Sequence, residues 1–305
     1  HAADLHVHTF FSRDVLPARP LHPLELYNKS RRLGLKFITF TDHDTMDAYD
    51  LIGWNRENLV TGVEIKIKDM DMVGHTIHVN VYDLAKDQFN ELEEIAQSGD
   101  LKTFLAYLKR NELPFVYNHP LWFEPNEMPN LAAIPRLARL FPVLEYNMYR
   151  INRKNELVMN IARKYNRGLV ASTDTHSGLI GKVYTLSKGY TFKEYFRNIK
   201  KGNSYIVIKD LTKQDLVEEI NTWIGIIFRN EMIQEASHIS TGVGYVDKII
   251  RILSSNTLMD FPRLQRSAMD LAYKISNSGL PALLYLRSER LLLPEIEKEM
   301  AQAFR

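Results

Sequence analysis

The stretch Asp4-Leu5-His6-Val7-His8-Thr9-Phe10-Phe11-Ser12-Arg13-Asp14 lies near the start of the chain and contains two of its 10 histidines. It reads as a first strand followed by a polar loop. Side chains at positions i and i+2 of a strand point to the same face, so His6 and His8 should project together while Val7 turns into a core. Two imidazoles directed at one point are either a metal chelate or a chance pair.

The composition limits the alternatives. The 305 residues suffice for one large domain or two smaller ones, and 45% hydrophobic with 25% charged residues is typical of an ordinary globular protein. A formal net charge of +2 does not favour a bulk nucleic-acid or membrane surface. Because the chain has no cysteine, any metal ion must be held by His, Asp and Glu.

The longest apolar stretches, such as residues 223–228, are far shorter than the roughly 20 residues that span a bilayer. No basic segment followed by an apolar one opens the sequence, as a secretory signal would require. We therefore expect a cytoplasmic enzyme with no membrane contact.

Strand and helix patterns alternate over residues 1–208, which predicts an α/β domain with a parallel sheet closed or nearly closed into a (β/α) barrel. The expected strands are residues 3–8, 36–40, 60–65, 76–81, 115–118, 143–146, 169–172 and 205–208. The expected helices are residues 23–33, 88–97, 101–111, 131–141, 155–165 and 192–200.

Residues 209–305 differ in character. Helical spacing of apolar residues occurs in segments 216–228, 246–254, 263–276 and 288–304, with breaks near 240–242 and 279–281. We expect an all-helical C-terminal extension that packs on the barrel or on another subunit, with a homodimer through this extension as one outcome. A second catalytic domain is the less favoured alternative.

Polar clusters follow the expected strands at residues 41–44, 62–64, 74–78, 118–120 and 172–176. The C-terminal ends of barrel strands converge on one face, so these clusters should become neighbours of the first. A lone histidine at a strand end is usually a hydrogen-bonded structural residue. Burying six histidines and three carboxylates together without metal would, however, carry a large desolvation cost. The candidate metal ligands are His6, His8, Asp14, His43, Glu64, His78, His119, Asp174 and His176.

Nine ligands exceed the four to six that one ion accepts, so we expect two or three divalent ions. Imidazole favours Zn, Fe or Mn over Mg. The three carboxylates offset only part of the charge of such ions. The site should therefore attract a small anionic substrate that bears phosphate, or a free phosphate or sulfate ion.

The motifs "DLHVHTFFSRD", "ITFTDHDT", "GVEI", "TIHV", "NHP" and "ASTDTHSG", in this order, resemble those of the PHP family, named for polymerase and histidinol phosphatase. The resemblance covers roughly residues 3–208. It implies a distorted (β/α)7 barrel with a trinuclear metal site that hydrolyses phosphoesters. The helical extension is not part of the family core, and no domain is inserted between the later motifs, which disfavours a nucleotide-specific assignment.

Carried over by position, the resemblance assigns the nine residues to three ions. One ion takes His6, His8, Glu64 and Asp174; Glu64 bridges to a second held by His78 and His119; the third takes Asp14, His43 and His176. His75 and His78 have opposite parity on a strand, so only one should face the site. The resemblance favours His78 and leaves His75 at the rim.

Three residues are candidates for catalytic roles: His43, Asp42 and Arg13. Asp42 and Asp44 flank His43, so one of them is expected to orient its imidazole. Arg13 is expected to hold a phosphate or its leaving group, with a solvated loop as the alternative. Further candidates for substrate contact or for support of the ligands are Tyr117, Glu145 and Asn147.

The first expectation for function is a phosphoesterase that uses metal-activated water on a small phosphomonoester or on a nucleotide or oligonucleotide end. The second is a metal-dependent amidohydrolase that cleaves C–N bonds. Against it, Glu64 occupies the bridging position where that class usually needs a modified lysine. The third is a catalytically silent PHP module that serves protein contacts.

Overall fold

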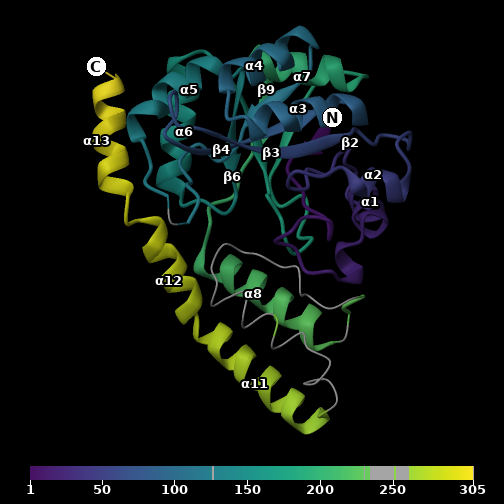
Figure 1. The fold of residues 1–305 in the computed structure, drawn as a ribbon. Helices are drawn as coiled ribbons and strands as arrows, with labels where there is room; N and C mark the ends of the chain where they lie inside the picture. Colours follow the sequence, from purple (N-terminus) through teal and green to yellow (C-terminus); the bar gives the residue numbers. More distant parts are fainter. Residues whose placement is uncertain (126, 230, 234–250, 252–260, 305) are drawn as a thin grey trace.

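The computed structural model describes residues 1–125, 127–229, 231–233, 251 and 261–304. It has two sheets flanked by helices and a C-terminal group of helices that runs along one side (Figure 1). The α/β class and the helical extension are therefore confirmed. The expected helix at 246–254 and the break near 240–242 lie outside the described residues.

The first sheet has the strand order β2-β1-β8-β9, and the second has the order β3-β4-β5-β6-β7. The first consists of β1 (Ala2–Asp4), β2 (Phe37–Ile38), β8 (Tyr184–Ser187) and β9 (Ser204–Val207). The second consists of β3 (Gly62–Asp69), β4 (His75–Tyr82), β5 (Phe115–Tyr117), β6 (Val143–Asn147) and β7 (Gly168–Ser172). Parallel bridges link Val7 to Thr175, Ile38 to Leu59 and His43 to Glu64, and so connect the two sheets.

The expectation of a parallel barrel needs correction. β4 is antiparallel to both β3 and β5, and β8 is antiparallel to β1 and β9, so both sheets are mixed. The β3–β4 connection shows the reason: only residues 70–74 separate the two strands, whereas a parallel crossover needs a dozen or more. Asp69 stabilises this turn by accepting the N–H groups of Asp71 and Met72.

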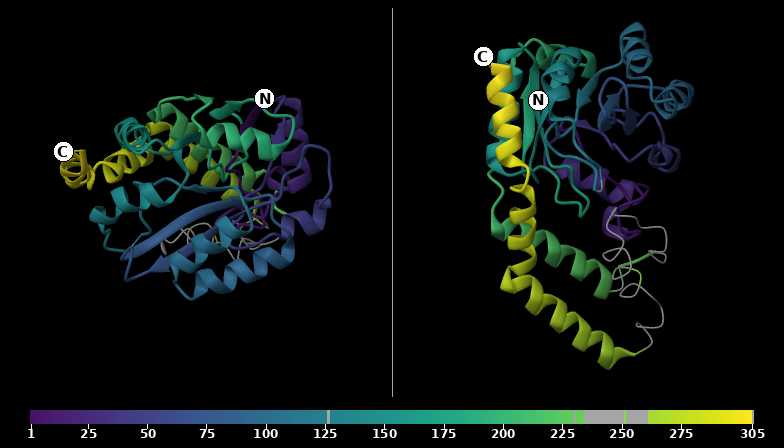
Figure 2. Two further views of the ribbon diagram at one scale, coloured as in Figure 1. Left: turned by 90° about the horizontal axis from the view of Figure 1, so that it is seen from above. Right: turned by 60° about the vertical axis from the view of Figure 1, so that its left-hand side comes forward.

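Helices α1 to α7 lie around the sheets, as the views in Figure 2 show. They are α1 (Pro23–Arg32), α2 (Asp47–Ile52), α3 (Lys86–Gln97), α4 (Leu101–Arg110), α5 (Ile134–Leu140), α6 (Asn152–Lys164) and α7 (Phe192–Lys200), with 3-10 turns η1 (Arg19–Leu21) and η2 (Leu131–Ala133). The sequence did not predict α2 or β8. The other elements of this part fall close to their predicted positions.

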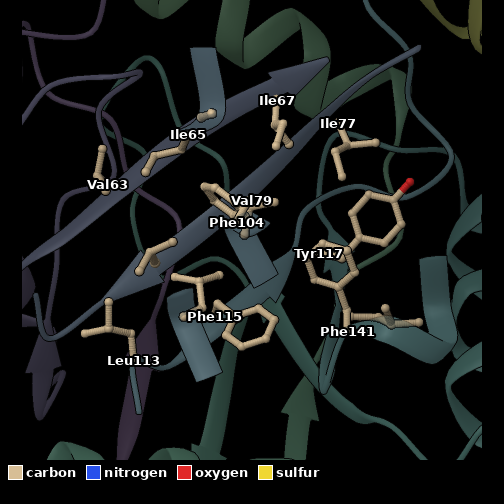
Figure 3. Packing of buried hydrophobic residues seen from close by; sticks show 14 of the residues in the cluster. Val63, Ile65, Ile67, Ile77, Val79, Phe104, Leu113, Phe115, Tyr117 and Phe141 are labelled. Carbon is tan, nitrogen blue, oxygen red and sulfur yellow. The ribbon is translucent and has the colours of Figure 1, made fainter. Parts of the chain in front are cut away.

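The main core lies between the second sheet and α4. Val63, Ile65 and Ile67 on β3 pack with Ile77 and Val79 on β4 and with Phe104, as Figure 3 shows. These alternating β-branched residues explain the strands, because one face of each strand is buried. Tyr117 stacks on Phe141 in the same cluster, so its side chain belongs to the core and not to the substrate site.

The C-terminal extension consists of α8 (Lys213–Phe228), α11 (Pro262–Ser278), α12 (Leu280–Glu289) and α13 (Leu293–Phe304). Gly279, with φ +72°, separates α11 from α12, where the sequence predicted a break. α8 packs on the loop after β1, since Ile227 and Phe228 form a cluster with Val15 and Leu16. No helix among the described residues is long and apolar enough to cross a bilayer.

Candidate metal centre

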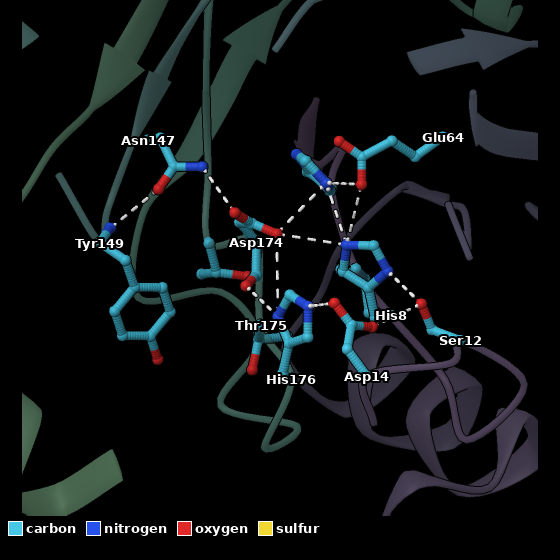
Figure 4. Close-up of polar contacts among 12 residues, drawn as sticks. His8, Ser12, Asp14, Glu64, Asn147, Tyr149, Asp174, Thr175 and His176 are labelled. Atoms are coloured by element: carbon cyan, nitrogen blue, oxygen red, sulfur yellow. Dashed lines mark hydrogen bonds and ion pairs between the residues drawn. The ribbon is translucent and has the colours of Figure 1, made fainter. Parts of the chain in front are cut away.

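The nine predicted ligands converge on one site, although they span residues 6 to 176. His6 and His8 follow β1, and His43 follows β2. Glu64 lies on β3, His78 on β4 and His119 just after β5. Asp174 and His176 follow β7, and Figure 4 shows them facing His8 and Asp14 from the opposite loop. Sequence reasoning thus predicted this grouping correctly.

Glu64 lies at the centre of the cluster and is fully buried. Its Oε2 is 3.1 Å from Nε2 of His6, 3.3 Å from Nε2 of His8 and 3.2 Å from Nδ1 of His43. Its Oε1 faces the other way, 3.0 Å from Nδ1 of His78 and 3.3 Å from Nε2 of His119. Each carboxylate oxygen therefore serves a different set of imidazoles.

Asp174 completes the first set. Its Oδ1 is 3.3 Å from Nε2 of His6 and 3.2 Å from Nε2 of His8, and these two ring nitrogens are 3.1 Å apart. Asp14 forms a separate set, with Oδ2 placed 3.2 Å from Nε2 of His43 and 3.0 Å from Nε2 of His176. His43 also contacts Glu64, and His8 also lies with Asp14, His43 and His176, so the sets overlap and the division among three ions stays a prediction.

The loops that carry these residues are fixed by two buried aspartates. Asp4 accepts the N–H and hydroxyl of Thr173 at 3.0 and 2.7 Å, and also the N–H of Gly181 at 3.0 Å. Asp42 accepts the N–H and hydroxyl of Thr9 at 2.6 and 2.7 Å. Each aspartate thus holds the loop of a neighbouring strand in place.

Two candidate ligands have backbone conformations that L-residues rarely adopt. His119 has φ +26° and Asp174 has φ +52°. Strain of this kind costs on the order of 1–3 kcal/mol and persists where the surroundings fix it. Here the His119 N–H donates to Glu145 at 2.8 Å, and the Asp174 N–H donates to the His6 carbonyl at 2.9 Å.

Polar neighbours orient the imidazoles and carboxylates from behind. Glu145 Oε1 is 2.7 Å from Nδ1 of His6, and Ser12 Oγ is 3.0 Å from Nδ1 of His8, so Nε2 of each ring points into the cluster. Asn147 donates to Asp174 at 2.9 Å. Glu145 and Asn147 thus support the cluster, as the sequence suggested.

The charges favour a cation. Burial alone would raise the pKa of Glu64, but His6, His43 and His78 hold that pKa well below its usual range. His176 and His43 likewise depress the pKa of Asp14 against the effect of burial. The pKa of Asp174 is also well below its usual range. Three ionised carboxylates thus lie in a dry environment, where positive charge must compensate them, either from protonated imidazoles such as His6 and His176, whose pKa values are raised, or from metal ions.

The donor set fits divalent metal ions. Three groups have all their ligand atoms within 4.8 Å of one another: His8, Asp14, His43 and His176; His6, His8 and Glu64; and His43, Glu64 and His78. The Nδ1 atom of His43 is buried and makes no hydrogen bond, although Glu64 Oε2 lies 3.2 Å away. A buried nitrogen without a hydrogen bond is costly, and a metal ion between it and the carboxylate would satisfy both.

A small cavity of about 90 Å³ opens among these groups. Besides Asp14, His43, Glu64, His78, His119, Asp174 and His176, its lining includes Trp122 and Arg150. The Arg150 guanidinium lies over the Trp122 ring, 5.5 Å from its centre. The Nε atom of Arg150 is buried without a hydrogen-bond partner. Sequence reasoning missed both residues, although Arg150 follows the predicted strand 143–146 closely.

Other predicted residues lie elsewhere. Asp42 binds Thr9 and not His43, because consecutive side chains of an extended segment point to opposite sides. Arg13 is about half exposed, and its Nη2 lies 3.8 Å from Asp44. It lines a neighbouring groove with Lys66 and Lys68. Neither side chain lines the cavity of the cluster.

The choice between His75 and His78 favours His78, which contacts Glu64. His75 points away: its Nδ1 accepts the Asn130 N–H at 3.2 Å, and its ring packs edge-on against Phe123. It is buried, so its expected place at the rim is wrong. The Nε2 atom of His78 lies 3.1 Å from Oε1 of Glu124, a contact that the sequence did not predict.

No protein-family model and no curated protein sequence matches the chain. Similar solved structures include a protein of Bifidobacterium adolescentis described as a metal-dependent phosphoesterase (16% identity, TM-score 0.38, 57% of this chain and 87% of that one). Another is the lesion-specific endonuclease PfuEndoQ of Pyrococcus furiosus (13%, 0.47, 71% and 65%). A third is an amidohydrolase of Chromobacterium violaceum (14%, 0.43, 67% and 97%). At these scores the three structures decide neither family nor reaction.

Proposed function

We propose that the chain is a metal-dependent phosphoesterase that hydrolyses a small phosphomonoester. The observation that carries the proposal is that Arg150 lines the same cavity as residues of the nine-residue cluster. Four imidazoles of the cluster and its three carboxylates line a cavity whose lining also includes a buried cationic side chain, Arg150. A cavity with metal ligands on one side and a guanidinium on the other suits a phosphate group.

The assignment of ligands follows the three sets of short distances. His6, His8, Glu64 and Asp174 would hold one ion, with Glu64 also serving a second beside His78 and His119. Asp14, His43 and His176 would hold a third. The imidazole-rich donor set favours Zn, Fe or Mn. Divalent ions in such sites supply a nucleophilic water at neutral pH and neutralise charge on phosphate oxygens.

The chain's own residues would position the phosphate. Arg150 is charged, because Tyr285 and Glu289 raise its pKa despite burial. Its free Nε–H can donate to a phosphate oxygen, while Nη1 is held by Glu289 at 3.1 Å. Trp122 lies edge-on against His78 and His119 and covers the cavity, which limits the entry of bulk water.

The test begins with elemental analysis of the purified full chain. A panel of phosphomonoesters, phosphodiesters and cyclic amides follows, with Mn, Fe, Zn and Mg each added in turn. We expect bound transition metal and release of phosphate from a monoester. Hydrolysis of cyclic amides alone would establish the amidohydrolase alternative, and a protein that retains metal but hydrolyses nothing would favour the scaffold alternative.

A pair of variants ties the activity to the site. His8→Ala should lose metal and activity. His22→Ala is the matched control, because His22 caps α1 through a 3.1 Å contact with the Leu24 N–H and does not line the cavity. Full metal content in His8→Ala would contradict the ligand assignment.

A further inference from the structure

A second cavity, here called the extension pocket, adjoins the metal cluster. Its volume is about 280 Å³, roughly three times that of the cavity at the cluster. From the sheet-bearing part of the chain it is lined by Tyr149, Arg150, Asp174 and His176. From the C-terminal extension it is lined by Leu216, Glu219, Ile220, Ala282 and Tyr285.

The two cavities have common walls. Arg150, Asp174 and His176 line both, so the two cavities lie next to each other with these three side chains between or beside them. The extension therefore contributes side chains next to the candidate metal ligands. A role restricted to stabilising the fold would not require this position.

The lining is mostly apolar, and its polar atoms are largely paired with one another. The Tyr285 hydroxyl donates to the Tyr149 carbonyl at 2.8 Å, and Nη1 of Arg150 donates to the Tyr285 oxygen at 3.1 Å. The Glu219 carboxylate accepts the hydroxyls of Tyr149 and Ser177 at 2.6 and 2.7 Å. The pocket thus offers aromatic and aliphatic surface but few free groups for a polar ligand.

These observations identify the occupant. Resting on the proposed function, we propose that the extension pocket receives the leaving group of the substrate, and that this group is an uncharged aromatic ring. Volume and apolar lining suit one ring, and the Glu219 carboxylate disfavours a second anionic group. Arg150, which lines both cavities and whose Nε has no hydrogen-bond partner, would bind the phosphate end. The C-terminal extension then determines substrate selectivity.

The test compares two non-hydrolysable probes, benzylphosphonate and methylphosphonate, by calorimetry on the metal-loaded full chain. Both present the same phosphonate, and only the first carries a ring. Burial of a ring in an apolar pocket predicts that benzylphosphonate binds on the order of 10- to 100-fold more tightly. Adding a para-carboxylate to the benzyl probe should cancel much of this preference, because it would approach Glu219.

A matched pair of variants on α8 locates the effect. Ile220 lines the pocket and also packs against the edge of the cluster that contains Val15 and Leu16, whereas Ile224, one turn further along, is buried in that cluster and does not line the pocket. Ile220→Ala should lower the preference for the benzyl probe about fivefold. Ile224→Ala removes the same atoms from a more buried position and should keep the wild-type preference.

The outcomes separate the two proposals. If methylphosphonate binds but the benzyl probe binds no more tightly, the pocket proposal is overturned and the phosphoesterase proposal stands. The pocket proposal is also overturned if wild type and Ile220→Ala prefer benzylphosphonate over methylphosphonate equally. It is overturned as well if Ile224→Ala lowers this preference as much as Ile220→Ala does. If neither phosphonate binds the metal-loaded protein, the proposed function fails, and the pocket proposal with it.

Discussion

Glu64 contacts five imidazoles through two oxygens, so the charge of a single side chain is shared by most of the cluster. Four of these rings come from loops and one from a neighbouring strand, and Asn118 donates to the same carboxylate at 2.8 Å. The organisation of the centre therefore depends on this residue more than on any one histidine.

Glu64→Gln should lose at least one metal ion with little change of fold. The amide has nearly the same shape, but it removes the charge that would bridge two ions. Metal content by elemental analysis and circular dichroism would be measured together. Glu94→Gln, an exposed change on α3, is the control. A native metal complement in Glu64→Gln would contradict the bridging role.

Arg150→Lys tests the phosphate-binding role of the guanidinium. Lysine keeps the positive charge but has no Nε–H directed at the cavity, so we expect kcat/KM to fall on the order of 100-fold, as the loss of a charge-assisted hydrogen bond implies. Metal content should stay at the wild-type level. An unchanged kcat/KM for the best phosphomonoester would show that Arg150 does not bind the phosphate of the substrate.

Among single residues, the sequence predicted that the nine candidate ligands converge, because each lies in a short motif at a strand end. The position of Arg150 could not be predicted, because it depends on Glu289, which is 139 residues away in the chain. Asp42 was misassigned because sequence adjacency to His43 does not reveal which way its side chain points.

Among the elements, α12 and α6 are joined by a buried ion-pair group. Glu289 on α12 is 3.1 Å from Arg150 and 3.2 Å from Lys154 on α6, and all three side chains are largely buried. Removing one partner from a buried group leaves an uncompensated charge, which is far more costly than losing an exposed pair. This group holds the extension against the sheet-bearing part of the chain.

Glu289→Gln should therefore lower the free energy of unfolding by about 3–5 kcal/mol. The control is Glu297→Gln on α13, whose pair with Arg153 is about half exposed and should contribute only about 0–1 kcal/mol. Urea denaturation of both variants, followed by circular dichroism, would measure the difference. If both variants lowered the free energy of unfolding equally, the buried ion-pair group would not be what holds the extension against the rest of the chain.

The positions of most helices and strands could be predicted, because the local spacing of apolar residues determines them. The pairing of the strands could not be predicted, because the directions of β4 and β8 depend on which neighbouring strand each one reaches after its connection. β8 escaped prediction because it has only four residues, two of them half-buried, although it lies between β1 and β9 in its sheet. The packing of α8 against residues 15–21 is a long-range contact that periodicity does not encode.

For the whole molecule, removal of metal should lower thermal stability. Ions that bind only the folded state stabilise it by about 4 kcal/mol at 1,000 times their Kd, which corresponds to a shift of several degrees in Tm. Treatment with a chelator should lower Tm, and adding back Mn or Zn should restore it. The His8→Ala variant should show a smaller shift, and an equal shift would place the stabilising metal elsewhere.

The homodimer expected through the extension stays a prediction. Leu264 and Leu271 on α11 and Leu283 and Leu284 on α12 are each more than half exposed. Light scattering of the full chain would decide the question. A dimer that dissociates in Leu271→Glu would support an interface on this extension, and a monomer at all concentrations would reject it.

The cluster also sets an order of events in biosynthesis. The segment that carries His6 and His8 is joined to the loop after β7 through the Val7–Thr175 bridge and the bond from the Asp174 N–H to the His6 carbonyl. At about 5–20 residues per second, roughly 10–40 s separate the emergence of these two segments from a ribosome. The segment that carries His6 and His8 therefore waits for the loop after β7, and acquisition of metal by the proposed site would be a late step in the maturation of the chain.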